Sequence, residues 1–424
     1  MPHRQFVFTM PKRFRLYFRF NRELLRKLPV LAWQAVLQVY RAVLDRDDVT
    51  AGMIVCIHTF GGCLSPRLDR RSEHWYFFPM KSSTIIIVML AAASVFSGCS
   101  GAEPCDPDTL EQLTQVRLDA QAAPKPPSVP FYVGVTIPGL RQDAVPQGLT
   151  YIGEQDRVII SHYGDGEPSR ISVLDNKSGK VTSSVVLKES SEDCHYGHVG
   201  GVATLNGSMW VASEGKVFQY DLEPLLAEPA PAVAVPVAVH EAETKASFCT
   251  ATDDMLFVGE FAHRSKFPFA HVSKFRTDES HHLKDRKGKM KYAWVCGYSA
   301  EDPMGTPSCV LSVRQRVQGM HVTGERVFLS LSYGRKNRST IVIYRNPLDE
   351  APHSEVTLSD GTSVPLWYLD GENYLSEIDF PPMAEGIAMI GNRLAVLSES
   401  GAAKFQKGGK EPLDTLLLLD VRDR

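Results

Sequence analysis

The sequence predicts an all-β fold, a single β-propeller that fills the C-terminal two-thirds of a 424-residue chain. Short apolar strands joined by tight turns recur from Val145 onward, and almost no long helical pattern follows residue 121. Four stretches open alike, with a polar residue close to glycine; they are VPQG from Val145, HVGG from His198, VQG from Val317 and AEG from Ala384. Four-stranded units repeated at blade length are the sequence signature of a propeller.

The first unit shows the pattern most clearly. Strands are expected at Leu149–Ile152, Arg157–Ser161, Arg170–Leu174 and Val181–Leu187, because each is apolar or β-branched and is bounded by turn residues. Asn206-Gly207 in the second unit is the strongest short hairpin signal of the chain.

Counting the openings, with a further one near Ser247, predicts five blades. Six blades also fit the length if Ser308–Val313 or Ser363–Leu369 hides a degenerate unit, and a β-sandwich is the alternative architecture. The charged segment Thr277–Lys291 is predicted to be an exposed hairpin tip, with His281 at the surface.

The two ends of the propeller are expected to meet in one blade. Phe131–Ile137 precedes the first unit and has strand composition, and Thr415–Val421 is the last apolar strand. Pairing these strands would close the ring and remove the exposed edges that an open array leaves.

Residues 80–98 have the pattern of an export signal. Lys81 supplies positive charge, and the apolar run Ile85–Phe96 is too short to span a bilayer, which needs about 20 residues. The following Ser97-Gly98-Cys99 resembles a bacterial lipoprotein signal, which implies that Cys99 is acylated and anchors the protein to a membrane of the cell envelope. A cleaved signal without lipid and a buried apolar helix are the alternatives.

The signal divides the chain into four parts. Residues 1–79 are expected to be an over-long gene model, with translation starting at Met80, or a disordered extension. Residues 99–130 are rich in Ala and Pro and are predicted to be a tether, and residues 131–424 form the propeller domain. The mass of the native protein's N-terminal peptide tests this start.

The net charge and the number of cysteines bear on two questions: whether the protein binds nucleic acid, and whether disulfide bonds stabilise it. The net charge of −3 gives no field that would point to nucleic acid. Eight cysteines are too few for a disulfide scaffold at this length. In an exported protein Cys296 and Cys309 could form a disulfide, and Cys194 with Cys249 is a second possible pair.

Polar side chains recur where each blade's first strand starts and its second strand ends. The two strands run in opposite directions, so both positions lie at one rim of the central channel. The predicted ligand-binding residues at this rim are Gln147, His162, Tyr163, His198, Glu214, Glu260, Gln318, Tyr333, Glu385 and Glu399.

Imidazoles and carboxylates gathered at a channel mouth have two possible uses. They can bind a cation such as Ca²⁺ or Zn²⁺, for which Glu385 and His198 are the candidate ligands. They can also hold a general base whose pKa is raised by neighbouring acids. The alternative is that each residue hydrogen-bonds the backbone of a neighbouring blade and closes the ring.

The PQG, HVGG and QG…SYG openings resemble those of uncharacterised exported bacterial propeller proteins. The blades more distantly resemble the SMP-30/gluconolactonase superfamily, which implies a divalent metal at the channel mouth and hydrolysis of a lactone or ester. Glu385-Gly386 partly matches the first-strand glutamate of that superfamily. The first unit departs from it with Gln147-Gly148, and the other strand starts carry no Asn or Asp.

The predicted function is therefore binding of a small molecule, glycan or protein at the channel mouth by a lipid-anchored propeller. The alternative is a metal-dependent lactonase or esterase-like hydrolase. No GxSxG, HExxH, CxxC or glycine-rich phosphate loop occurs in the sequence, so no motif assigns a catalytic residue.

Overall fold

The computed structural model describes residues 51–56, 75–77, 85–88, 125–142, 144–164, 166–264, 275–406 and 408–422. The chain divides into two compact units, Met1–Ser100 and Gly101–Arg424. In the first unit, β1 (Ala51–Cys56), β2 (Trp75–Phe77) and β3 (Ile85–Val88) form a small sheet. Most of the predicted signal, and Cys99 itself, lie outside the described residues, so the lipid anchor stays a prediction. Among the described residues no helix is long and apolar enough to cross a membrane.

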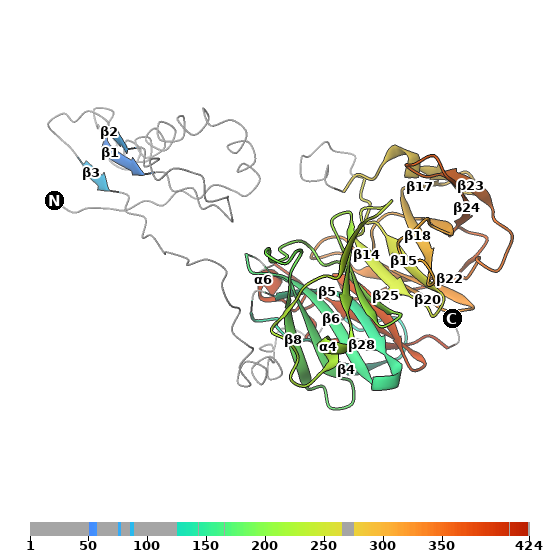
Figure 1. The fold of residues 1–424 in the computed structure, drawn as a ribbon, viewed down its shortest axis with the longest axis horizontal. Helices are drawn as coiled ribbons and strands as arrows, with labels where there is room; N and C mark the ends of the chain where they lie inside the picture. Colours follow the sequence, from blue (N-terminus) through green and yellow to red (C-terminus); the bar gives the residue numbers. More distant parts are fainter. Residues whose placement is uncertain are drawn as a thin grey trace. The chain divides into compact units, whose positions relative to one another are not determined.

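The second unit is a five-bladed β-propeller, built from five sheets of consecutive antiparallel strands (Figure 1). Blade 1 comprises β5 (Ala144–Ile152), β6 (Arg157–Gly164), β7 (Arg170–Asp175) and β8 (Val181–Leu187). Blade 2 comprises β9 (Gly201–Leu205), β10 (Ser208–Ser213), β11 (Lys216–Asp221) and β13 (Ala238–Glu241). Blade 3 comprises β14 (Phe248–Ala251), β15 (Met255–Gly259), β18 (Ala293–Ser299) and β19 (Cys309–Val313).

Blades 4 and 5 have the same four-stranded arrangement and bring the number of blades to five. Blade 4 comprises β20 (Val317–Val322), β21 (Arg326–Leu331), β22 (Ser339–Arg345) and β25 (Tyr374–Phe380). Blade 5 comprises β26 (Ala384–Ile390), β27 (Arg393–Ser398), β28 (Thr415–Asp420) and β4 (Phe131–Thr136). The short helical elements are η1 (Gly153–Gln155), α4 (Glu223–Leu226), η2 (Glu279–His281) and α6 (Ala403–Gln406). The prediction of five blades is confirmed, and the six-blade alternative is wrong.

The ring closes as predicted. The first strand of the second unit, β4, pairs antiparallel with β28 as the outer strand of blade 5 (Figure 1). The first strands contact one another around the ring in the order β5, β9, β14, β20, β26 and back to β5.

The recurrent glycines have a structural cause at the centre of this ring. A Cβ on Gly148 would lie 2.6 Å from the Val202 nitrogen of blade 2, and one on Gly386 would lie 2.5 Å from the Leu149 nitrogen of blade 1. Adjacent first strands therefore approach backbone to backbone, and only glycine leaves the space that this approach needs.

Serines of the second strands form hydrogen bonds that stabilise these contacts between first strands. Ser161 accepts a hydrogen bond from Gly148 N at 2.9 Å and donates one to Val199 O of blade 2 at 2.7 Å. Ser330 of blade 4 donates in the same manner to Glu385 O of blade 5. Part of the rim polarity thus closes the ring, as the alternative interpretation of the sequence expected.

Two blades reach back to cover the edge of the preceding blade. The connection between β11 and β13 of blade 2 adds β12 (Val233–Ala234) in parallel to β8 of blade 1. The connection between β22 and β25 of blade 4 contributes β23 (Ser354–Thr357) and β24 (Ser363–Tyr368), and β24 pairs in parallel with β19 of blade 3. We call residues 346–373 the blade 4 strap. Covering an outer strand removes an edge that could pair with another chain.

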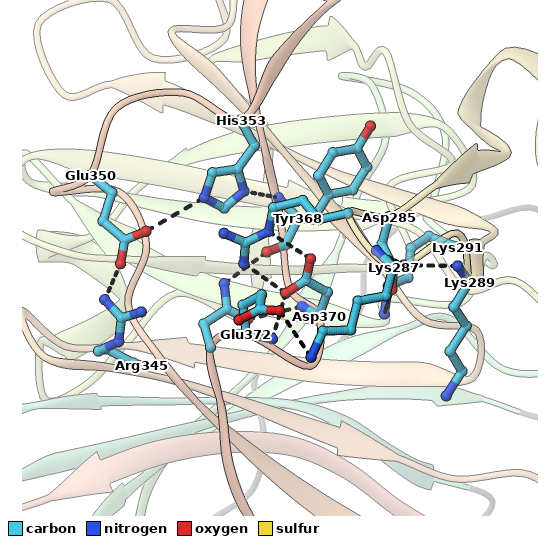
Figure 2. Close-up of polar contacts among 12 residues, drawn as sticks. Asp285, Lys287, Lys289, Lys291, Arg345, Glu350, His353, Tyr368, Asp370 and Glu372 are labelled. Carbon is cyan, nitrogen blue, oxygen red and sulfur yellow. Dashed lines mark hydrogen bonds and ion pairs between the residues drawn. The ribbon is translucent and has the colours of Figure 1, made fainter.

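The predicted exposed tip at residues 277–291 is instead fastened to this strap, which corrects the sequence expectation. The segment contains β16 (Leu283–Lys284) and β17 (Met290–Lys291), and Asp285 and Lys291 are both buried and form an ion pair at 3.4 Å. Arg286 donates two hydrogen bonds to the buried carboxylate of Asp370, at 2.7 and 2.8 Å. Figure 2 shows this network, together with the more exposed pair between Lys287 and Glu372.

Candidate functional site

Two glutamates of blade 5 meet glutamines from the blades on either side. Gln318 Nε2 of blade 4 donates to Glu385 Oε1 at 2.9 Å. Gln147 Nε2 of blade 1 donates to Glu399 Oε2 at 3.0 Å. Glu385 lies at the start of β26 and Glu399 directly follows β27, so the antiparallel pair places both acids at one rim. Four of the ten predicted residues are thus brought together, and we call Glu385 and Glu399 the acid pair.

The acid pair is electrostatically unusual. Burial raises the pKa of Glu385 well above its ordinary value, the negative charge of Glu399 raises it further, and the Gln318 hydrogen bond offsets part of this effect. Burial also raises the pKa of Glu399, to about 7, against the lowering effects of the Gln147 hydrogen bond and the charges of Lys404 and Arg335. Burial and mutual repulsion thus favour the protonated form of the pair, and its two carboxyls titrate as a coupled system.

A cationic and aromatic group borders the acid pair on the side of blades 1 and 2. Lys404, from α6, donates its Nζ to the Tyr163 hydroxyl at 3.1 Å and lies 4.8 Å from the centre of that ring. The Tyr163 ring lies 4.3 Å from the His198 ring, and His198 Nδ1 lies 3.8 Å from Glu214 Oε1. The His198 and Glu214 side chains are 57% and 69% exposed, so this edge of the rim is open to solvent.

A second aromatic pair joins blades 3 and 4. The Tyr333 ring stacks on His263 with 3.8 Å between ring centres, and the Arg316 guanidinium lies 5.6 Å from the centre of the Tyr333 ring. Tyr333 was predicted at the rim. His263 and Arg316, like Lys404, were not predicted, because they lie one to several residues beyond the strand ends that the repeats identify.

Two of the predicted ligand-binding residues, Glu260 and His162, are not part of the rim contacts described above. Glu260 turns to the outer side of blade 3, where its Oε1 accepts hydrogen bonds from His281 Nδ1 at 2.7 Å and from Trp294 N at 3.0 Å. His162 is buried, and within the described residues neither of its ring nitrogens has a hydrogen-bond partner. Burial lowers the pKa of His162 to about 3, so this imidazole is neutral at physiological pH.

The predicted disulfides are not formed, because none of Cys194, Cys249, Cys296 and Cys309 is bonded to another cysteine in the structure. In the β18–β19 pairing Cys296 is opposite Val310, whereas Cys309 is opposite Gly297. Adjacent residues of a strand point to opposite faces of the sheet. The two thiols accordingly belong to different core clusters.

The residues of the rim do not fit a metal centre. His198 is paired with Glu214 rather than with Glu385, and the two glutamines direct N–H donors at the carboxylates, where a cation would need oxygen. Within the described part of the chain no three His, Cys, Asp or Glu residues are grouped so that they could hold a metal ion. The described rim residues therefore do not offer Ca²⁺ or Zn²⁺ a suitable set of ligands.

Comparisons with known proteins add no functional assignment. No family model and no curated protein sequence matches the chain. Among solved structures, it is similar to a glutaminyl cyclase from Myxococcus xanthus, at 9% identity over 70% of this chain and 97% of that chain, with a TM-score of 0.36. It is also similar to a GH43_1 enzyme from Xanthomonas citri, at 10% identity over 68% of this chain and 90% of that chain, again with a TM-score of 0.36. A putative glucose dehydrogenase from Thermus thermophilus matches at 12% identity over 69% of this chain and 100% of that chain, with the same score. Likenesses this distant carry no argument about activity.

Proposed function

We propose that the protein is a ligand-binding propeller whose rim takes a small molecule through a protonated amino group, seated on the acid pair. The observation that carries the proposal is the placement of two acids at one rim, each held by a glutamine of a neighbouring blade, and burial raises the pKa of both. Two buried acids that repel one another are stabilised by any positive charge placed between them. A ligand ammonium would supply that positive charge, and it would replace a proton that the acid pair otherwise holds.

The surrounding groups support a small polar ligand. Gln318, Tyr333 and Glu399 are partly exposed, so a ligand can approach the Glu399 side of the acid pair, while Glu385 is 3% exposed behind it. Lys404 and Arg335 lie close enough to lower the pKa of Glu399, and they could meet an anionic or polar end of the same ligand. Attachment of the protein to a membrane through Cys99 is part of this proposal and rests on the sequence alone.

Calorimetric binding of ethanolamine and glucosamine to the full propeller tests the proposal. For ethanolamine the affinity should rise roughly tenfold between about pH 6 and pH 8, because Glu399 loses its proton across this range while the ethanolamine ammonium stays charged. Glu399→Gln should weaken binding and remove its pH dependence. The matched control is Glu214→Gln, which changes an exposed rim acid outside the pair.

Each result has a definite meaning. If the affinity is the same at both pH values, or if Glu399→Gln has no effect on it, the acid pair is not the binding site of the ligand amine. Tight binding of Ca²⁺ or Zn²⁺ that depends on Glu385, together with lactone hydrolysis, would instead favour the hydrolase alternative.

A further inference from the structure

A cleft lies at blade 3, and its lining includes neither the acid pair nor the two glutamines bonded to it. Its volume is about 710 Å³. Three segments line it: residues 243–245, which lead from blade 2 into blade 3; residues 276–281; and residues 357–359 of the blade 4 strap. A cleft of this size is within the range that small-molecule sites occupy, about 300–1,000 Å³.

The floor of the cleft holds a buried carboxylate–imidazole pair. Glu260 is 1% exposed, and its Oε1 accepts a hydrogen bond from His281 Nδ1 at 2.7 Å. Backbone N–H groups of Trp294 and Lys245 satisfy the rest of the carboxylate, at 3.0 and 3.3 Å. The His281 ring lies flat on Trp294, with 3.9 Å between ring centres and 14° between planes. The imidazole is therefore fixed from two sides.

This arrangement prepares the second ring nitrogen of His281 for a ligand. With Nδ1 engaged by a carboxylate, Nε2 is the nitrogen left for other contacts, and Glu260 supplies the counter-ion that a doubly protonated imidazole requires. Among the described residues Arg276, which lines the same cleft, forms no hydrogen bond or ion pair within the protein. The cleft thus offers two donors that other side chains do not use.

Three acids line the cleft: Glu260 is the partner of His281 Nδ1, and the other two hydrogen-bond serines of the cleft walls. Glu243 accepts hydrogen bonds from Ser359 N at 3.1 Å and from the Ser359 hydroxyl at 2.8 Å. Asp278 accepts hydrogen bonds from Ser280 N and from the Ser280 hydroxyl, at 2.9 and 2.7 Å. Both oxygens of Glu243 are therefore bonded to the wall, whereas only Oδ1 of Asp278 is.

The walls are held in place by the network of Figure 2. The ion pair between Arg286 and Asp370 fastens the segment after His281 to the strap that supplies the opposite wall. A site built between fixed walls loses little conformational entropy when a ligand binds.

We propose that this cleft is a second binding site, which takes a small ligand through an oxyanion group, a carboxylate or a phosphate, held by His281 Nε2 and Arg276. Protonated imidazole and guanidinium are the donors that recognise such groups through charge-assisted hydrogen bonds. The site is independent of the acid pair, and its ligand can be a different molecule.

Ring-proton NMR of the histidines tests the site with inorganic phosphate and citrate as probes. The His281 signal should shift saturably as either probe is added. The signal is identified by its loss in His281→Gln. Arg276→Gln should weaken the affinity roughly tenfold or more, the expected cost of one charge-assisted hydrogen bond. Lys284→Gln is the matched control, because Lys284 is an exposed nearby cation that does not line the cleft.

A second measurement keeps the test decisive if a variant is unstable. In the unaltered protein the Nδ1 proton of His281 should give a slowly exchanging, downfield resonance, and this resonance should be lost in Glu260→Gln. The proposal is overturned if no probe shifts His281 saturably, or if Arg276→Gln and Lys284→Gln change the affinity equally. It is equally overturned if the Nδ1 proton exchanges freely in the unaltered protein.

Discussion

Gly386→Ala is expected to lower the free energy of unfolding by about 3 kcal/mol, the upper part of the range for overpacking a tight site. The new Cβ would lie 2.5 Å from Leu149 N and 2.9 Å from Gln147 O, and both are backbone atoms of the neighbouring first strand. A backbone atom cannot rotate away as the end of a long side chain can, so blades 5 and 1 would have to separate. Urea unfolding followed by fluorescence measures the change.

Gly324→Ala is the control for this prediction. A Cβ at Gly324 meets nothing within 4 Å, and this glycine does not have a positive φ angle. Its replacement should change stability by no more than a few tenths of a kcal/mol. Equal stability of the two variants would show that the first strands are not in the close contact described above.

Arg286→Ala is expected to have an effect of similar size, about 3 kcal/mol, because it leaves the Asp370 carboxylate buried without its partner. The Asp370 side chain is fully buried, and both of its oxygens accept hydrogen bonds from Arg286. Without the guanidinium, the strap and the 277–291 segment lose their buried ion pair and keep the more exposed pair between Lys287 and Glu372 (Figure 2). Thermal and urea unfolding of the purified protein measure the loss.

The neighbouring residue provides a matched comparison. Lys287 and Glu372 form an ion pair at 2.9 Å, but their side chains are 60% and 49% exposed. Lys287→Ala should therefore cost less than about 1 kcal/mol. In a double-mutant cycle, Asp370→Asn should recover part of the stability lost in Arg286→Ala. If the two alanine variants are equally stable, the ion pair at Asp370 does not hold the strap.

The fold could be predicted from the sequence because its signals are local and repeated. Turn pairs such as Asn206-Gly207 and the periodic polar–glycine openings fix the strands one at a time. The same glycines also form the centre of the ring, so the feature that identified the repeats proved to be a packing requirement. The strap was not predicted, because the length of a connection does not say which blade its strands will join.

The candidate site was predicted only in part. Strand ends locate a rim, and this was enough to bring Gln147, Gln318, Glu385 and Glu399 together. A position at the rim does not fix the direction of a side chain, and Glu260 turns outward to His281 because a buried imidazole and the Trp294 amide lie there. The burial that raises the pKa values of the acid pair comes from packing among residues far apart in the chain, and it leaves no local pattern in the sequence.

The most direct test of the ligand-binding rim is a carbon-13 NMR titration of the glutamate side-chain carboxyls in the folded protein. The expected result is a Glu399 titration with a midpoint of about 7, and a Glu385 carboxyl that stays protonated well above the ordinary range. Added ethanolamine should lower the Glu399 midpoint, because the ammonium stabilises the ionised form. If both carboxyls instead titrate near 4.5 and do not respond to the amine, the acid pair does not exist as described and the proposed function is contradicted.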